Sequence, residues 1–173
     1  MVNYYINMER EPVLLMIFSI FFLVTLLVNM DHGSVPAATS EIAGDLNFSK
    51  VEIGAVGSLV FVGLTAGSSV AGICYHKFNP KWIVSLFTCL TGISLILFPL
   101  SQGNRTLVYS ARLMAGFCQV FLVVYFPVWV DIFSPEKWRT LWLTFLQLAV
   151  PLGVILGYSL TALMLSFYSV TFT

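Results

Sequence analysis

Long apolar runs separated by short polar segments dominate the chain. Five of them approach the ~20 residues that a helix needs to cross the ~30 Å apolar core of a bilayer. None alternates polar and apolar positions as a strand would, and helices satisfy every backbone hydrogen bond within lipid. The pattern predicts an all-α membrane protein, residues 1–173 forming a single transmembrane helical domain. The predicted helices cover residues 12–32, 53–75, 83–100, 107–130 and 141–165.

Two linkers carry signals for the start of a helix. Ser49 and Glu52 have the spacing of a capping box directly before the second run, so we expect that helix to begin there. Ser134, Pro135 and Glu136 supply an N-cap residue, a proline suited to the first helical position and an acid for the first turn. We therefore expect the fifth helix to begin at this second signal.

The composition agrees with a bilayer environment. Hydrophobic residues make up 58% of the chain and charged residues 9%, and 15 phenylalanines accompany only eight lysines and arginines. So little polar surface leaves most of the outside to meet lipid. The formal net charge is zero, which gives no reason to expect nucleic acid as a partner. The three cysteines lie in apolar runs, and we interpret them as buried thiols and not as a disulfide framework.

The basic residues predict an orientation with the N-terminus in the cytoplasm. Cytoplasmic loops carry an excess of lysine and arginine, and this orientation places five such residues inside and two outside. Two N-glycosylation sequons, at Asn47 and Asn104, then both fall on the outer face, although short loops can hold them too close to the membrane for modification. The inside set is Arg10, Lys77, Lys81, Lys137 and Arg139, and the outside set is Lys50 and Arg105.

Glycines spaced four positions apart mark two of the predicted helices. Gly63 and Gly67 lie in the second, and Gly153 and Gly157 lie in the fifth. Such small faces let helix backbones approach closely in lipid. They serve either as tight packing alone or as surfaces that slide during a rocking motion.

Two ionisable residues lie within the apolar runs, at a cost of at least ~2.5–3.5 kcal/mol for a charge at membrane depth. Asp31 falls about 28 Å along its helix from residue 12, and Arg112 about 9 Å from residue 106, at ~1.5 Å per residue. Because the helices run in opposite directions, both charges reach a similar depth and can pair. The pair is either static or a switch. In the switch, Arg112 holds an anionic substrate group and protonation of Asp31 releases the arginine.

Polar residues accompany this pair. His32 titrates near neutral pH and either tunes the switch or is an interfacial polar residue. Asn29 shares a face with His32, whereas Asp31 points elsewhere unless Gly33 and Pro36 break the helix. The fourth and fifth predicted helices each carry a stripe of polar residues. These stripes either line a polar path or form interhelical hydrogen bonds worth ~0.6 kcal/mol each. They are Arg112, Gly116 and Gln119 on the fourth helix and Gln147, Pro151 and Tyr158 on the fifth.

Motifs of soluble catalysis are missing from the sequence. It contains no HExxH, CxxC, GxSxG or phosphate-binding loop, and its only histidines are His32 and His76. We therefore expect no enzymatic activity, no metal site and no cofactor.

Several stretches resemble the N-terminal half of a major facilitator superfamily transporter, most closely its Spinster-like branch. Residues 29–32 (Asn-Met-Asp-His) resemble the first-helix motif Asn-Tyr-x-Asp-Arg, with histidine in place of arginine. Residues 112–116 (Arg-Leu-Met-Ala-Gly) resemble the superfamily's fourth-helix arginine motif. Residues 127–139 and 151–158 are similar to the Spinster-like run from the end of the fourth helix through the fifth.

The resemblance also implies a cytoplasmic gate. The superfamily signature Gly-x-x-x-Asp-Arg-x-Gly-Arg-Lys here reads Gly-Ile-Cys-Tyr-His-Lys-Phe-Asn-Pro-Lys over residues 72–81, so His76 replaces the acid. Lys77 or Lys81 can still pair with Asp131, in a surface interaction worth ~0–1 kcal/mol. Arg139 completes this group.

A transporter of this kind has twelve helices in two six-helix halves, with the solute site between them. The chain would supply five, a partial N-terminal six-helix repeat, and is a fragment, a truncated paralogue or a subunit of a larger assembly. We expect it to take part in alternating-access transport of a small organic or lipid-like solute, with protons as a candidate coupling ion. Its partners would be the bilayer and the remaining transporter half or another membrane protein. The alternative is a non-transporting structural or regulatory subunit that uses its glycine faces to bind another membrane protein.

Overall fold

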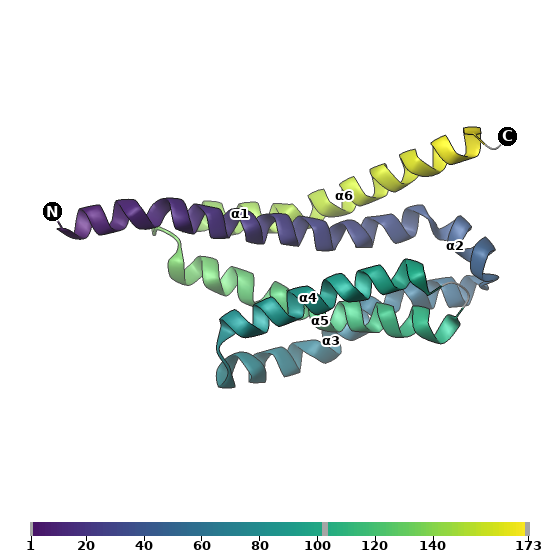
Figure 1. Ribbon diagram of the computed structural model, residues 1–173, viewed down its shortest axis with the longest axis horizontal. Coiled ribbons are helices and arrows are strands. Elements are labelled where there is room, and N and C mark those ends of the chain that lie inside the picture. The colour runs from purple at the N-terminus through teal and green to yellow at the C-terminus, as the bar shows by residue number, and fades with distance from the viewer. Residues whose placement is uncertain (1, 102–103, 172–173) are drawn as a thin grey trace.

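A computed structural model describes the backbone of residues 2–101 and 104–171, and the side chains of residues 11–44, 46–101 and 104–167. The described chain folds into helices joined by short turns (Figure 1). Five of these helices are long and apolar enough to cross a membrane, in agreement with the predicted number. The helices are α1 (Val2–Ala37), α2 (Thr39–Leu46), α3 (Lys50–Lys77), α4 (Pro80–Leu100), α5 (Arg105–Phe133) and α6 (Arg139–Thr171).

The predicted start of the second spanning helix is correct, and that of the last one is wrong. Ser49 and Glu52 form the capping box at the start of α3, with the Ser49 backbone N–H donating to the Glu52 carboxylate at 2.8 Å. Ser134 instead ends α5, and its hydroxyl is buried without a hydrogen-bond partner among the described residues. A turn closed by the Trp138 N–H on the Pro135 carbonyl follows, and α6 begins only at Arg139.

The short helix α2 was not predicted. It has eight residues, of which Thr39, Ser40, Glu41 and Asp45 are polar, so it carries neither the length nor the apolar content of a spanning segment. It follows α1 directly and leads into the turn before α3. The only described non-glycine residue with positive φ, Asn47, ends it with φ 50° and ψ 45°.

The spanning helices form two groups that lie side by side (Figure 1). One group pairs α1 with α6, and the other packs α3 and α4 against α5. Glycines join the helices within each group. A Cβ atom on Gly116 would collide with the Val60 carbonyl oxygen across the α3–α5 crossing, and one on Gly157 would collide with the Met30 carbonyl oxygen across the α1–α6 crossing.

The four glycines singled out in the sequence all lie in these crossings. Gly63 and Gly67 face α5, and Gly153 and Gly157 face α1. Gly33 supplies a close approach from the α1 side, where a Cβ atom would meet the Val154 carbonyl. The small residues thus remove side-chain bulk from both crossings, as expected for helices that associate in lipid.

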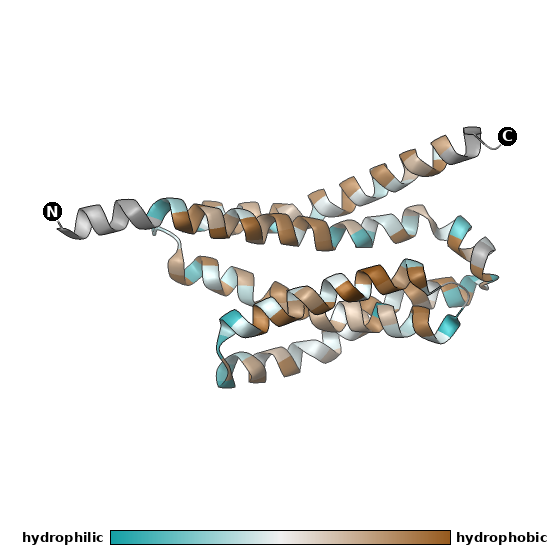
Figure 2. Cartoon of the chain, viewed as in Figure 1, coloured by the Kyte–Doolittle hydropathy of each residue, from teal (hydrophilic) through white to brown (hydrophobic). Residues whose placement is uncertain are grey.

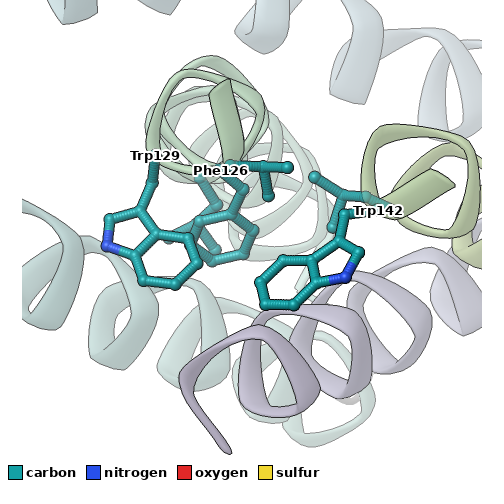
Figure 3. Packing of buried hydrophobic residues seen from close by; sticks show 6 residues of the cluster. Phe126, Trp129 and Trp142 are labelled. Atoms are coloured by element: carbon teal, nitrogen blue, oxygen red, sulfur yellow. The ribbon is translucent and has the colours of Figure 1, made fainter. Parts of the chain in front are cut away.

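Aromatic packing joins the two groups near the end of the bundle that carries the N-terminus. Figure 3 shows Phe126, Trp129 and Trp142 gathered where α5, α6 and α1 meet. Phe21 of α1 stacks on Phe126 with ring centroids 4.1 Å apart, and Phe18 lies 4.6 Å from Trp142. These ring contacts between α1, α5 and α6 pack the two groups against each other.

Hydrophilic positions gather at the helix ends, with a hydrophilic band interrupting the later part of α1 (Figure 2). The thiols are less uniformly buried than predicted. Cys118 is buried in the centre of the bundle, whereas Cys89 is exposed on α4 and Cys74 is intermediate. An apolar thiol suits an exposed position on a spanning helix, whether lipid or another helix faces it.

Candidate functional site

An ion pair between α1 and α5 forms the centre of the candidate site. Arg112 Nη1 donates to Asp31 Oδ2, and only 3% of the arginine side chain and 18% of the aspartate side chain are exposed. The pair lies in the half of the bundle nearer α2, because Arg112 follows the start of α5 by two turns and Asp31 precedes the end of α1 by a similar length. The two charges thus meet at the similar depth that helix arithmetic predicted.

The guanidinium of Arg112 has an ion-pair partner and an aromatic neighbour, but two of its nitrogens have no hydrogen-bond partner among the described residues. Its Cζ atom lies 3.7 Å from the centroid of the Phe98 ring, so the aromatic face orients the guanidinium plane. Nε and Nη2 are buried and have no hydrogen-bond partner among the described residues. A buried unsatisfied donor costs about 1–3 kcal/mol, and more when charged. Two in-plane donors on one edge match the geometry of a carboxylate or phosphate.

A cavity of about 910 Å³ adjoins the ion pair, and we call it the Arg112 cavity. Its lining includes the two charges and three hydroxyl groups, and the other lining residues are apolar. Its volume falls in the range of small-molecule binding sites. The lining residues are Asp31, Ser34, Val35, Ala38, Ile42, Leu46, Leu95, Phe98, Pro99, Ser101, Arg112 and Thr161.

A second polar contact joins α1 to α5 beside the ion pair. His32 Nε2 lies 3.1 Å from Gln119 Oε1, so the imidazole is the donor in this pair. The His32 ring also stacks on Phe61 of α3, with centroids 5.8 Å apart. Of the two alternatives left open by the sequence, a regular helix or a break at Gly33 and Pro36, the structure has the regular one, because α1 is continuous to Ala37. The adjacent residues Asp31 and His32 instead both reach α5.

Amide side chains gather around a smaller cavity between α1, α5 and α6. Asn29, Gln119 and Gln147 line this space of about 60 Å³, whose other walls are mainly apolar. Asn29 is buried and donates to the Thr25 carbonyl oxygen at 2.7 Å. Gln119 therefore both contacts His32 and lines this smaller cavity. Tyr158, from the predicted α6 stripe, is 52% exposed, with its backbone beside Gly33.

The predicted gate residues lie at the end of the bundle away from α2. Asp131 pairs with Arg139 at 3.7 Å, and not with a lysine as the resemblance implied. His76 and Lys77 close α3, and Lys81 lies in the first turn of α4. Asp131 and the three basic residues are exposed and Arg139 is partly exposed, so an ion pair here is screened by water and worth little.

Both sequon asparagines lie at the α2 end of the bundle. Asn47 ends α2, and Asn104 caps α5 by accepting a hydrogen bond from the Leu107 N–H. Both are exposed. Whether they carry glycans stays a prediction.

A bundle of apolar helices with an ion pair at membrane depth beside a cavity defines a class, the multi-pass membrane proteins with an internal polar site. The sequence of residues 17–173 matches the model of the Major Facilitator Superfamily, and the chain belongs to that family. It is therefore an integral, multi-pass membrane protein of a family of transporters, in agreement with the resemblance found in the sequence.

The curated relatives are named as transport proteins. A probable sphingolipid transporter, spinster homolog 1, of Arabidopsis thaliana is 25% identical over 128 residues, covering 74% of this chain and 26% of the relative. A probable hexose phosphate transport protein of Chlamydia trachomatis serovar D is 29% identical over 86 residues, covering 50% of this chain and 19% of the relative. A probable metabolite transport protein of Bacillus subtilis strain 168 is 24% identical over 151 residues, covering 87% and 32%. The chain thus spans about a fifth to a third of each relative's length. No solved structure shows a significant match.

Proposed function

We propose that the chain forms part of a secondary transporter that moves a small organic or lipid-like solute by alternating access. The observation that carries this proposal is the state of Arg112, which is 3% exposed, satisfied by Asp31 at one nitrogen and unpartnered at two others. Buried donors usually have a hydrogen-bond partner, and Arg112 is the one described residue with two buried side-chain donors that lack one. The adjoining cavity of about 910 Å³ provides room for a solute.

In this mechanism Arg112 binds an anionic group of the solute, and Asp31 competes for the same guanidinium. Protonation removes the charge of Asp31 and weakens its ion pair with Arg112. The arginine then binds the anionic group of the solute more readily. His32 lies next to Asp31 and bonds to Gln119, which places a second titratable group beside the switch. Protons thereby become the candidate coupling ion.

The name of one relative agrees with an anionic group. A hexose phosphate carries a phosphate, an oxyanion that accepts hydrogen bonds of the kind that Nε and Nη2 of a guanidinium donate. A sphingolipid joins a polar head to apolar chains, and the Arg112 cavity likewise joins charged and apolar walls. The remaining transporter half, or another membrane protein, would supply the opposite wall of the translocation path.

A non-transporting subunit is the less favoured alternative. The glycine faces expected to bind another membrane protein are already occupied, since Gly63, Gly67, Gly153 and Gly157 contact helices of the same chain. Gly54, Gly57 and Gly72 on α3 have open space around them and would have to form such a surface instead.

Ligand-dependent stability tests the proposal on the chain itself. We expect a hexose phosphate or a lysophospholipid near 100 times its Kd to stabilise the detergent-solubilised protein by about 2.7 kcal/mol, read as a rise in melting temperature. The matched uncharged compounds, the free hexose and a monoacylglycerol, should give a smaller shift. Arg112→Ala should lose the shift, while Asp31→Asn, which mimics the protonated acid, should enlarge it.

Lys137→Ala is the matched control, because this exposed basic residue lies at the opposite end of the bundle from the Arg112 cavity. It should retain the response of the unmodified chain. Equal shifts in the melting temperature of Arg112→Ala and the unmodified protein would show that Arg112 does not bind the compound. The absence of a shift with either anionic compound would contradict binding of an anionic group.

We also propose that the N-terminus is cytoplasmic. Lys50 and Lys137 are exposed at opposite ends of the bundle. Placed singly in a cysteine-free background, Lys50→Cys should react with a membrane-impermeant thiol reagent in intact cells, and Lys137→Cys only after permeabilisation. The reverse pattern would overturn the orientation.

A further inference from the structure

The short helix α2 lies between two cavities. Its N-cap residue Ala38, with Ile42 and Leu46 one and two turns on, lines the Arg112 cavity. Thr39 and Ala43, on a neighbouring face, line a separate cavity of about 440 Å³. A helix with open space on two faces forfeits the packing contacts that fix a buried helix in place. Its position is therefore determined mainly at its ends.

Both ends of α2 are points where the chain changes direction. At the first, Ala38 has φ −99° and ψ 14° and makes no side-chain capping bond, directly after the end of α1. At the second, Asn47 adopts φ 50° and ψ 45°, in the left-handed region that asparagine tolerates better than most residues. Between these two points the eight residues of α2 form one rigid element.

A single arginine from the start of α5 holds the second of these points. Arg105 Nη1 donates to Glu52 Oε1 at 2.5 Å, and Nη2 donates to the Asn47 carbonyl oxygen at 3.3 Å. The guanidinium also lies over the Phe48 ring, 5.3 Å from its centroid. Phe48 is buried and stacks on Tyr109 of α5, so the turn after α2 is anchored while α2 itself borders open space.

We propose that α2 is a lid over the mouth of the Arg112 cavity, turning about Ala38 and Asn47 and held closed by the contacts of Arg105. In the closed position Ile42 and Leu46 cover the apolar wall of the cavity. Loss of the Arg105 contacts frees the end of α2 and admits water and solutes to Arg112 and Asp31. The proposed lid controls access to the cavity, so the proposal does not depend on which solute the site binds.

Thiol accessibility in unsealed membranes tests the lid without any transport measurement. The reporter is Ser34→Cys, which lines the Arg112 cavity and nearly preserves side-chain size, in a background with Cys74, Cys89 and Cys118 changed to alanine. Glu52→Gln removes the ion pair to Arg105 and leaves a residue that can still complete the capping box with Ser49. We expect the reporter to react with a charged thiol reagent about two- to fivefold faster in this variant, the scale of one exposed ion pair.

Arg105→Ala removes the contact to the Asn47 carbonyl as well and should accelerate the reaction further, whereas Arg105→Lys should lie between the two. Lys137→Cys, exposed at the opposite end of the bundle, is the matched control and should keep its rate in every variant. Unchanged reactivity of the cavity reporter in Glu52→Gln and Arg105→Lys overturns the lid. A parallel rise at both reporters also overturns it, since it would indicate general loosening of the bundle.

Discussion

Gly116→Ala is expected to destabilise the protein by about 3 kcal/mol or more, because a Cβ atom at this position collides with the backbone carbonyl of Val60. A backbone atom cannot move aside as the end of a flexible side chain can, so the α3–α5 crossing must open. Gly63→Ala meets the Leu113 carbonyl from the other side of the same crossing and should have a comparable effect. Unfolding of the detergent-solubilised protein in increasing denaturant measures both.

Gly57→Ala provides the matched control on α3. A Cβ atom there meets nothing within 4 Å, so the alanine should be neutral or stabilise the helix by up to ~1 kcal/mol through its better helix propensity. If Gly116→Ala and Gly57→Ala unfold alike, the close approach of α3 to α5 does not occur. The same contrast applies to the α1–α6 crossing, where Gly157 is the tightly packed position.

Asp31→Ala is expected to cost about 3–5 kcal/mol, since it leaves the guanidinium of Arg112 buried without its partner. The double variant Asp31→Ala with Arg112→Met should recover most of this loss, because replacing both members of a buried ion pair by apolar groups is often nearly neutral. Denaturant unfolding of the two single variants and the double variant gives the coupling energy directly.

Asp131→Ala is the comparison for this cycle. Its partner Arg139 lies 3.7 Å away, but the two side chains are 63% and 40% exposed, so we expect a loss of only ~0–1 kcal/mol. A cost for Asp31→Ala no larger than that for Asp131→Ala would show that water reaches Arg112 freely. In that case the unpartnered nitrogens of Arg112 would not support the binding of an anion at this site.

The predicted spans show how far hydrophobic periodicity determines a membrane fold. All five were correct in number, and the capping box at Ser49 fixed the start of α3. The start signal assigned to the last helix was wrong, because Ser134, Pro135 and Glu136 have the composition of an N-cap yet form a turn between α5 and α6. Local propensity is a weak guide where two spanning helices must be connected across an interface.

The candidate site was predictable in part. Helix arithmetic placed Asp31 and Arg112 at similar depth, and the ion pair lies there. Phe98, which stacks on the guanidinium, gave no signal because a phenylalanine in an apolar run is expected in any spanning helix. Gly33 was considered only as a point where the first helix could break and Gly116 as part of a polar stripe, whereas both are packing positions.

By itself the sequence determined the class of protein, the number of spans and the residue types that are costly at membrane depth. These features depend on transfer from water to lipid, which is nearly a sum over residues along each helix. Only the tertiary structure decided that α1 pairs with α6 and that α5 packs against α3 and α4. It also left two nitrogens of Arg112 unpartnered and placed α2 beside the same cavity. Such features depend on which helix faces meet, and in lipid that choice is made by close packing and not by hydrophobicity.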